Sequence, residues 1–164
     1  MLPSGRPGPV VLPHPIITVT RVADLPEGFA ELAADALGDG QRMLEVLAED
    51  WEAGTLRFDR EGEALFAAHS PHGLIGLAGL TRDPYAVGGP DPEAVGRVRR
   101  LYVLRAARGA GAGRALVEAS AEVARDFGYA KLRVRSPVSA FAFYAACGFL
   151  RTVGEKGATH ARVV

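Results

Sequence analysis

Hydrophobic and polar residues change their spacing several times along the chain, and each change marks a predicted element. In 16–22, "IITVTRV", β-branched and polar residues alternate with a period of two, which is typical of a strand. In 25–39 the apolar residues Phe29, Ala33 and Leu37 recur at helical spacing. The same criteria predict strands at 16–22, 62–70, 73–82, 97–104, 130–135, 149–155 and 159–164, and helices at 25–39, 41–54, 114–127 and 136–148.

The order of these elements predicts a mixed sheet. A helix joins the strand at 97–104 to the strand at 130–135, and such a unit makes a parallel crossover. The "SPHG" turn at 70–73 instead joins two strands into an antiparallel hairpin. We therefore expect an α/β fold with one mixed central sheet of about six to seven strands and about four helices packed on it.

Length and proline content set the expected domain boundaries. The chain has 164 residues, which favours one domain that buries about two thirds of its unfolded surface. Residues 1–15 contain five prolines, which fix φ and lack an N–H donor. We expect a flexible Pro-rich arm at 1–15 and a single domain at 16–164.

Composition excludes several classes of protein. The net charge is zero, with 19 basic and 19 acidic residues, which argues against a nucleic-acid-binding protein. Cys147 is the only cysteine and the four histidines are scattered, so we expect neither a disulfide nor a metal site. No apolar run is long enough for a membrane span or a signal peptide, so we expect no membrane partner and a cytoplasmic location.

The glycine-rich turn "RGAGAG" at 108–113 lies between a predicted strand and a predicted helix. It fails the dinucleotide pattern, because Arg114 and Leu116 stand where a third glycine is required. It fails the nucleoside triphosphate pattern, because no Gly-Lys pair exists. Small side chains would still leave successive amides exposed at the helix start, where a pyrophosphate binds well. The alternative is a tight turn that needs glycine only for its backbone angles.

The R-x-x-G-x-G pattern after the "LYV" strand resembles the acetyl-CoA signature of the GNAT superfamily of N-acetyltransferases. Val103 lies five residues before Arg108, which is that family's usual spacing. "FYAACGF" at 143–149 is similar to its aromatic-Tyr-x-x-x-Gly-Phe block, and two early helices also match. The resemblance covers 16–164.

The resemblance implies that acetyl-CoA is the cofactor and that a small-molecule primary amine attacks its thioester directly in a ternary complex. The pantetheine arm would pair with the strand residues Leu101, Tyr102 and Val103. Pro137 stands where many relatives carry Asn, and Ser136 or Ser139 could supply the polar contact instead. The alternative for each serine is a helix cap or a surface position. The residues implied for the pyrophosphate are Arg108, Gly109, Ala110, Gly111, Ala112, Gly113 and Arg114.

The resemblance places Tyr144 at the family's general-acid position, and the alternative is a packing role for its ring. Histone-acetylating relatives carry a catalytic Glu where this chain has Arg97, which cannot act as a base. The remaining candidate bases, each of which could also be a surface group, are Asp83, Glu93, His69 and His72.

The acceptor and some alternatives stay open. Arg97 and Arg99 share a strand face and favour an acceptor with a carboxylate or phosphate, whereas acidic residues in 83–93 favour a polyamine or aminoglycoside. A non-catalytic acyl-CoA-binding module, acetylation of a protein amine and a nucleotide-binding oxidoreductase are the other possible functions. An edge strand near the C-terminus could pair in a homodimer.

Overall fold

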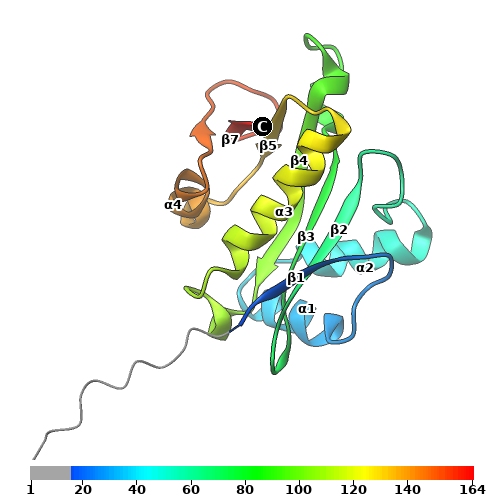
Figure 1. Cartoon of the computed structure of the whole chain (residues 1–164), viewed down its shortest axis with the longest axis vertical. Coiled ribbons are helices and arrows are strands. Elements are labelled where there is room, and N and C mark those ends of the chain that lie inside the picture. Colours follow the sequence, from blue (N-terminus) through cyan, green and yellow to red (C-terminus); the bar gives the residue numbers. More distant parts are fainter. Residues whose placement is uncertain (1–15) are drawn as a thin grey trace, which may run out of the picture.

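A computed structural model describes residues 16–164, so the predicted arm at 1–15 lies outside the described residues. One mixed sheet has the strand order β1-β2-β3-β4-β5-β7-β6 (Figure 1). Its strands are β1 Thr18–Val22, β2 Ala64–Ser70, β3 Gly73–Arg82, β4 Val95–Val103, β5 Lys131–Val134, β6 Leu150–Arg151 and β7 His160–Val163. The α-helices are α1 Phe29–Gly38, α2 Met43–Ala53, α3 Ala112–Phe127 and α4 Phe141–Ala146. The predicted α/β fold class is confirmed.

The strand pairings agree with the predicted connections. β1 to β4 are antiparallel neighbours, and β4 and β5 form the parallel pair around α3. β6 and β7 form an antiparallel hairpin at the C-terminal end, although β6 is only two residues long where a strand at 149–155 was predicted. None of the helices within 16–164 is both long and apolar enough to cross a membrane.

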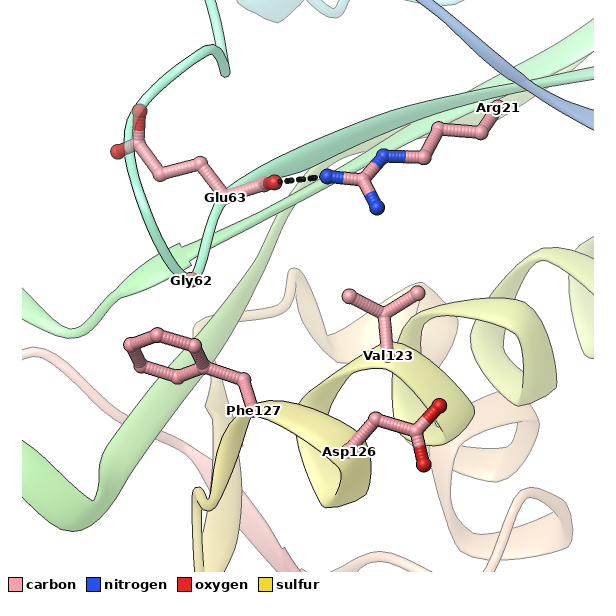
Figure 2. Close-up of a pocket in the computed structure, with 6 residues that line it drawn as sticks. All are labelled: Arg21, Gly62, Glu63, Val123, Asp126 and Phe127. Carbon is pink, nitrogen blue, oxygen red and sulfur yellow. Dashed lines mark hydrogen bonds between the residues drawn. The ribbon is translucent and has the colours of Figure 1, made fainter.

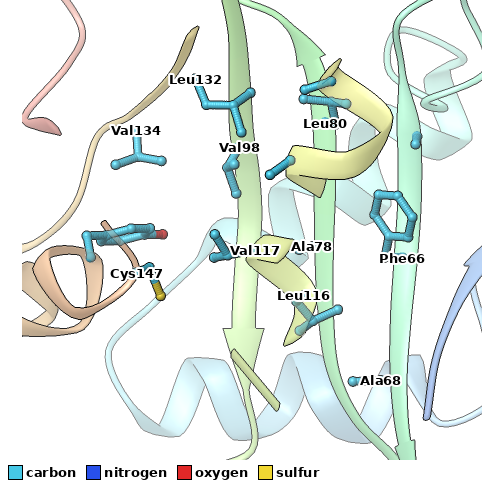
Figure 3. Packing of buried hydrophobic residues seen from close by; sticks show 14 of the residues in the cluster. Phe66, Ala68, Ala78, Leu80, Val98, Leu116, Val117, Leu132, Val134 and Cys147 are labelled. Atoms are coloured by element: carbon cyan, nitrogen blue, oxygen red, sulfur yellow. The ribbon is translucent and has the colours of Figure 1, made fainter. Parts of the chain in front are cut away.

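Helices cover both faces of the sheet. α3 packs on one face because its buried residues, including Leu116 and Val117, recur on one side of the helix. Figure 3 shows Val117 beside Val98 of β4, and Leu116 belongs to the same buried cluster. The opposite face carries α1 and α2, which contribute Leu32, Leu44 and Leu47 to a second buried cluster. The sheet therefore lies between two hydrophobic layers.

Two predicted helix starts were wrong. The predicted helix at 136–148 is α-helical only from Phe141, since Pro137 is extended (φ −64°, ψ 153°) and a short 3₁₀ turn follows it. Ser136 is therefore not its N-cap. The first helix begins at Phe29, with Gly28 in the N-cap position, because a turn that includes Pro26 comes first.

Candidate active site

β4 and β5 separate soon after they begin to pair. The parallel register joins only Val95, Gly96 and Arg97 to Lys131, Leu132 and Arg133. β4 continues to Val103, and within the described residues no strand pairs with 98–103 on the side of β5. The unpaired stretch contains the predicted pantetheine residues Leu101 to Val103. Its free N–H and C=O groups form an edge to which an extended ligand can add.

A β-bulge interrupts this free edge at Arg100. Arg100 has φ 57°, and the register with β3 shifts between Leu77 and Gly79. Two residues of β4 therefore oppose one residue of β3, which bends the strand. Such a backbone is strained for a residue other than glycine, and strain of this kind occurs at functional sites.

The free edge of β4 leads to the N-terminus of α3. Gly111 is the N-cap residue with φ 95°, and no side chain caps the helix. A Cβ added at Gly109 or at Gly111 would have no heavy atom within 4 Å. The amides of the first turn, from Ala112 to Arg114, are thus next to open space, and the helix dipole favours an anion there.

Gly113 has a different function from the other two glycines of the turn. A Cβ at Gly113 would lie 2.9 Å from Cε2 of Phe143 in α4. This glycine lets α3 and α4 approach each other closely, and α4 carries Tyr144.

The side chain of Arg108 binds the protein itself. Its Nε donates to the carbonyl oxygen of Val103 (3.2 Å), and an NH₂ group donates to the Asp39 carboxylate (2.8 Å). The hydrogen bond to Asp39 raises the pKa of Arg108. Nearby, Asp35 accepts from the hydroxyl of Tyr102 (2.5 Å) and the backbone N–H of Arg105 (3.0 Å). Arg108 thus fixes the shape of the loop.

The sequence reasoning missed Asp35 and Asp39. Two acidic residues four positions apart at the end of a predicted helix were the available signal, because such residues lie on one side of a helix. Their hydrogen bonds lower the pKa of both, chiefly through Tyr102 for Asp35 and Arg108 for Asp39.

Two other predicted contact residues also use their side chains within the protein. Arg114 donates to the carbonyl oxygen of Ala146, at the end of α4. The buried Ser136 donates its hydroxyl to the carbonyl oxygen of Pro137 (2.8 Å). The Ser136 hydroxyl can still accept a hydrogen bond, and the other N–H groups of the Arg114 guanidinium and its backbone amide can still donate to a ligand.

Tyr144 lies in the core below the α3–α4 contact. It is 7% exposed, and its ring centroid is 5.0 Å from that of Phe143 and 5.5 Å from that of Phe149. Burial raises the pKa of its hydroxyl, with a smaller contribution from Cys147. Within 16–164 this hydroxyl makes no hydrogen bond to a side chain. The phenol is therefore protonated and available as a donor.

The candidate bases do not gather around the bulge. The buried Asp83 carboxylate lies 2.9 Å from Arg133 and 3.6 Å from Arg97. Its Oδ1 is thus ion-paired with Arg97 and its Oδ2 with Arg133. Glu93 is exposed and pairs with Arg82, and His69 and His72 lie at the β2–β3 hairpin, which extends past the end of β4.

The surface depression drawn in Figure 2 lies away from this site. Its walls are Arg21, the turn at Gly62 and Glu63, and Val123, Asp126 and Phe127 of α3. These α3 residues belong to the last turns of the helix, roughly 15 Å or more from its N-terminus at a rise of about 1.5 Å per residue. The depression thus adds no residue to the site.

The fold and the site define a class of protein, namely a mixed α/β domain whose sheet opens between two parallel strands above a glycine-lined helix start. The model of the "Acetyltransferase (GNAT) family" matches residues 28–149, so the chain belongs to this family. None of the curated protein sequences matches the chain.

Solved structures show the same fold. A candidate acetyltransferase from Exiguobacterium sp. 255-15 is 28% identical, with a TM-score of 0.76 over 90% of this chain and 93% of that one. The GNAT family N-acetyltransferase YhbS from Escherichia coli, solved with CoA, is 21% identical, with a TM-score of 0.63 over 93% and 84% of the two chains. A candidate streptothricin acetyltransferase from Bacillus anthracis, solved with acetyl coenzyme A, is 17% identical, with a TM-score of 0.50 over 58% and 52%.

Proposed function

We propose that this protein is an acetyl-CoA-dependent N-acetyltransferase that acetylates a primary amine of a small molecule. The observation that carries the proposal is the continuity of two features: the free edge of β4 at 98–103 ends beside the uncapped N-terminus of α3. An extended arm and a pyrophosphate are the two parts of coenzyme A that such a surface fits. The two CoA complexes among the similar structures support this choice of ligand.

The residues present fit the cofactor. The amides of Ala112, Gly113 and Arg114 would hold the pyrophosphate, and the open space at Gly109 and Gly111 leaves room for it. The backbone of 101–103 would pair with the pantetheine arm. Acetyl-CoA, when bound, supplies an acetyl thioester that an amine can attack without a covalent enzyme intermediate.

The chain would contribute two further groups to the reaction. An amide near the bulge at Arg100 would polarise the thioester carbonyl and stabilise the negative charge that grows there. The protonated Tyr144 hydroxyl would give its proton to the leaving thiolate. Since Asp83 and Glu93 are both ion-paired, we infer that the attacking amine loses its proton to water.

Calorimetry and a thiol-release assay over a panel of amines test this proposal. We expect CoA to bind with a micromolar Kd and acetyl-CoA to yield free thiol only when an amine is present. Tight CoA binding without thiol release would instead support the non-catalytic acyl-CoA-binding module. Release with histone peptides alone would support acetylation of a protein amine, and the absence of CoA binding would refute both cofactor-based functions.

A further inference from the structure

The bulge in β4 places two neighbouring arginines on one face of the sheet. Arg99 is opposite Gly79 in the antiparallel register, and a Cβ on Gly79 would point into the ring of Phe58, which belongs to the cluster under α1 and α2. Directly opposite residues share a face, so Arg99 lies on the α1–α2 face. Arg100 is on the same face, because its guanidinium is 3.5 Å from Asp50 of α2.

Arg99 and Arg100 have donors that the protein leaves unused. Arg99 is half-buried, and within 16–164 it makes neither an ion pair nor a side-chain hydrogen bond. The Nε of Arg100 is buried without a hydrogen-bond partner among the described residues. A buried donor without an acceptor is costly, so such a group needs an explanation.

The charges around this pair are not balanced. The cations on this face are Arg97, Arg99, Arg100 and Arg133, and the carboxylates that reach them are Asp50, Asp83 and Glu155. Burial lowers the pKa of both Arg97 and Arg100, and the charge of Arg99 lowers each further. Arg99 is thus the cation without a carboxylate, between two others that it repels.

We propose that Arg99, together with Arg100, binds an anionic group of the acceptor. The substrates are then primary amines that carry a carboxylate or a phosphate a few bonds from the nitrogen. The inference rests on the proposed function, because Arg100 is the bulge residue beside which the thioester carbonyl would lie. One anionic oxygen group would neutralise Arg99, and the positive charge of Arg100 on the same face would add to the attraction.

A cationic acceptor does not suit these charges. The acidic residues that favoured a polyamine or an aminoglycoside are in 83–93. The structure pairs Asp83 with two arginines and Glu93 with Arg82, and Asp91 precedes the start of β4, whereas the bulge is near the other end of that strand. The free charge nearest the bulge is therefore positive, and it would repel a polycation.

Matched acceptors test the inference on the full-length chain. The panel compares amino acids with their amides and phosphoethanolamine with ethanolamine, so that carboxylates and phosphates are tested in separate pairs. Spermidine is the cationic acceptor with which both pairs are compared. We expect the anionic member of at least one pair to have a kcat/KM about tenfold or more above its neutral partner. Arg99→Gln should lower that kcat/KM about 10- to 100-fold, mainly by raising KM, and should lower the kcat/KM of the neutral amine much less.

Two further measurements separate binding from catalysis. The anionic acceptor should bind the CoA-saturated protein, and Arg99→Gln should weaken this binding by a similar factor while the Kd of CoA stays the same. Arg99→Lys should retain part of the preference. Arg125→Gln is the control, because it removes an exposed positive charge at the far end of α3.

The inference is overturned if neutral or cationic amines are preferred, if Arg99→Gln and Arg125→Gln behave alike, or if no anionic acceptor binds the CoA-saturated protein. These results leave the proposed function intact as long as CoA binds and amines release thiol. Loss of CoA binding in the unaltered protein would instead remove the proposed function.

Discussion

The hydroxyl of Tyr144 is a polar atom on a buried ring. Its ring packs against Phe143 and Phe149, and burial raises its pKa above that of an exposed phenol. The neutral form therefore persists to high pH, and the proposed proton donor would not be lost by ionisation in any ordinary assay. Deleting only this oxygen separates its chemistry from the packing of the ring.

Tyr144→Phe should lower kcat about 10- to 100-fold, because it removes the proton donor for the thiolate and keeps the ring. The Kd of CoA should stay within about twofold of its original value, because the substitution leaves the proposed contacts to the pyrophosphate and to the pantetheine arm unchanged. Steady-state kinetics and calorimetry check both expectations. Tyr129→Phe is the matched control, because that hydroxyl donates to the carbonyl oxygen of Gly62 (2.9 Å), outside the proposed site. Equal kcat values for the two variants would assign Tyr144 to packing alone.

The contacts of Arg108 could be predicted only in part from its sequence motif. Arg108 was predicted from the signature to contact the pyrophosphate, and that contact stays a prediction. Its guanidinium binds Asp39, which is 69 positions away in the sequence. A local sequence pattern contains no information about such a distant partner. The ion pair that holds this loop in place could therefore be found only in the folded chain.

At the scale of elements, α3 ends in the same way at both termini. Gly111 precedes it with φ 95° and Gly128 follows it with φ 108°, and an added Cβ would meet nothing within 4 Å at either position. An alanine at either position should therefore cost a similar stability, about 1 kcal/mol, through left-handed backbone strain.

Only one of these two ends is proposed to hold a phosphate. Gly111→Ala should weaken CoA binding about tenfold or more, because the new methyl group occupies the open space beside the first-turn amides. Gly128→Ala should lower the unfolding midpoint equally and leave the Kd of CoA unchanged. Thermal unfolding and calorimetry on both variants provide the comparison. If both variants bind CoA like the unaltered chain, the pyrophosphate does not lie at this helix start.

The accuracy of the sequence predictions also differs between elements. β2 and β3 were predicted from two apolar runs on either side of the turn at 70–73, and such runs are typical of strands that are buried on both faces. The helical spacing in α3 was sufficient because that helix buries one side. The separation of β4 from β5 left no such trace, since residues 98–103 keep a strand pattern whether or not a partner is present. The bulge at Arg100 could not be predicted from the sequence either, because arginine does not indicate a left-handed backbone as glycine or asparagine does.

At the scale of the whole molecule, one buried charge cluster connects distant parts of the chain. Asp83 comes from the β3–β4 connection, and Arg97 and Arg133 face each other on β4 and β5. The two arginines also donate to the carbonyl oxygens of Gly157 (2.6 Å) and Lys156 (2.8 Å) in the β6–β7 connection. The cluster thus fixes both loops at the point from which β4 and β5 separate.

Asp83→Asn distinguishes this role from the catalytic base predicted from the sequence. It removes the carboxylate that two buried guanidinium groups share, and only Arg133 keeps another partner, Glu155. It should therefore lower the free energy of unfolding by about 3 kcal/mol or more and the melting midpoint by roughly 10 °C. Glu93→Gln removes an exposed partner of Arg82 and should change stability by less than about 1 kcal/mol. If Asp83 were the catalytic base, Asp83→Asn would leave the melting midpoint unchanged. It would instead cause a large loss of kcat, which a rise in pH would recover. Because water is the proposed proton acceptor, the folded fraction of Asp83→Asn should retain its kcat below the melting transition.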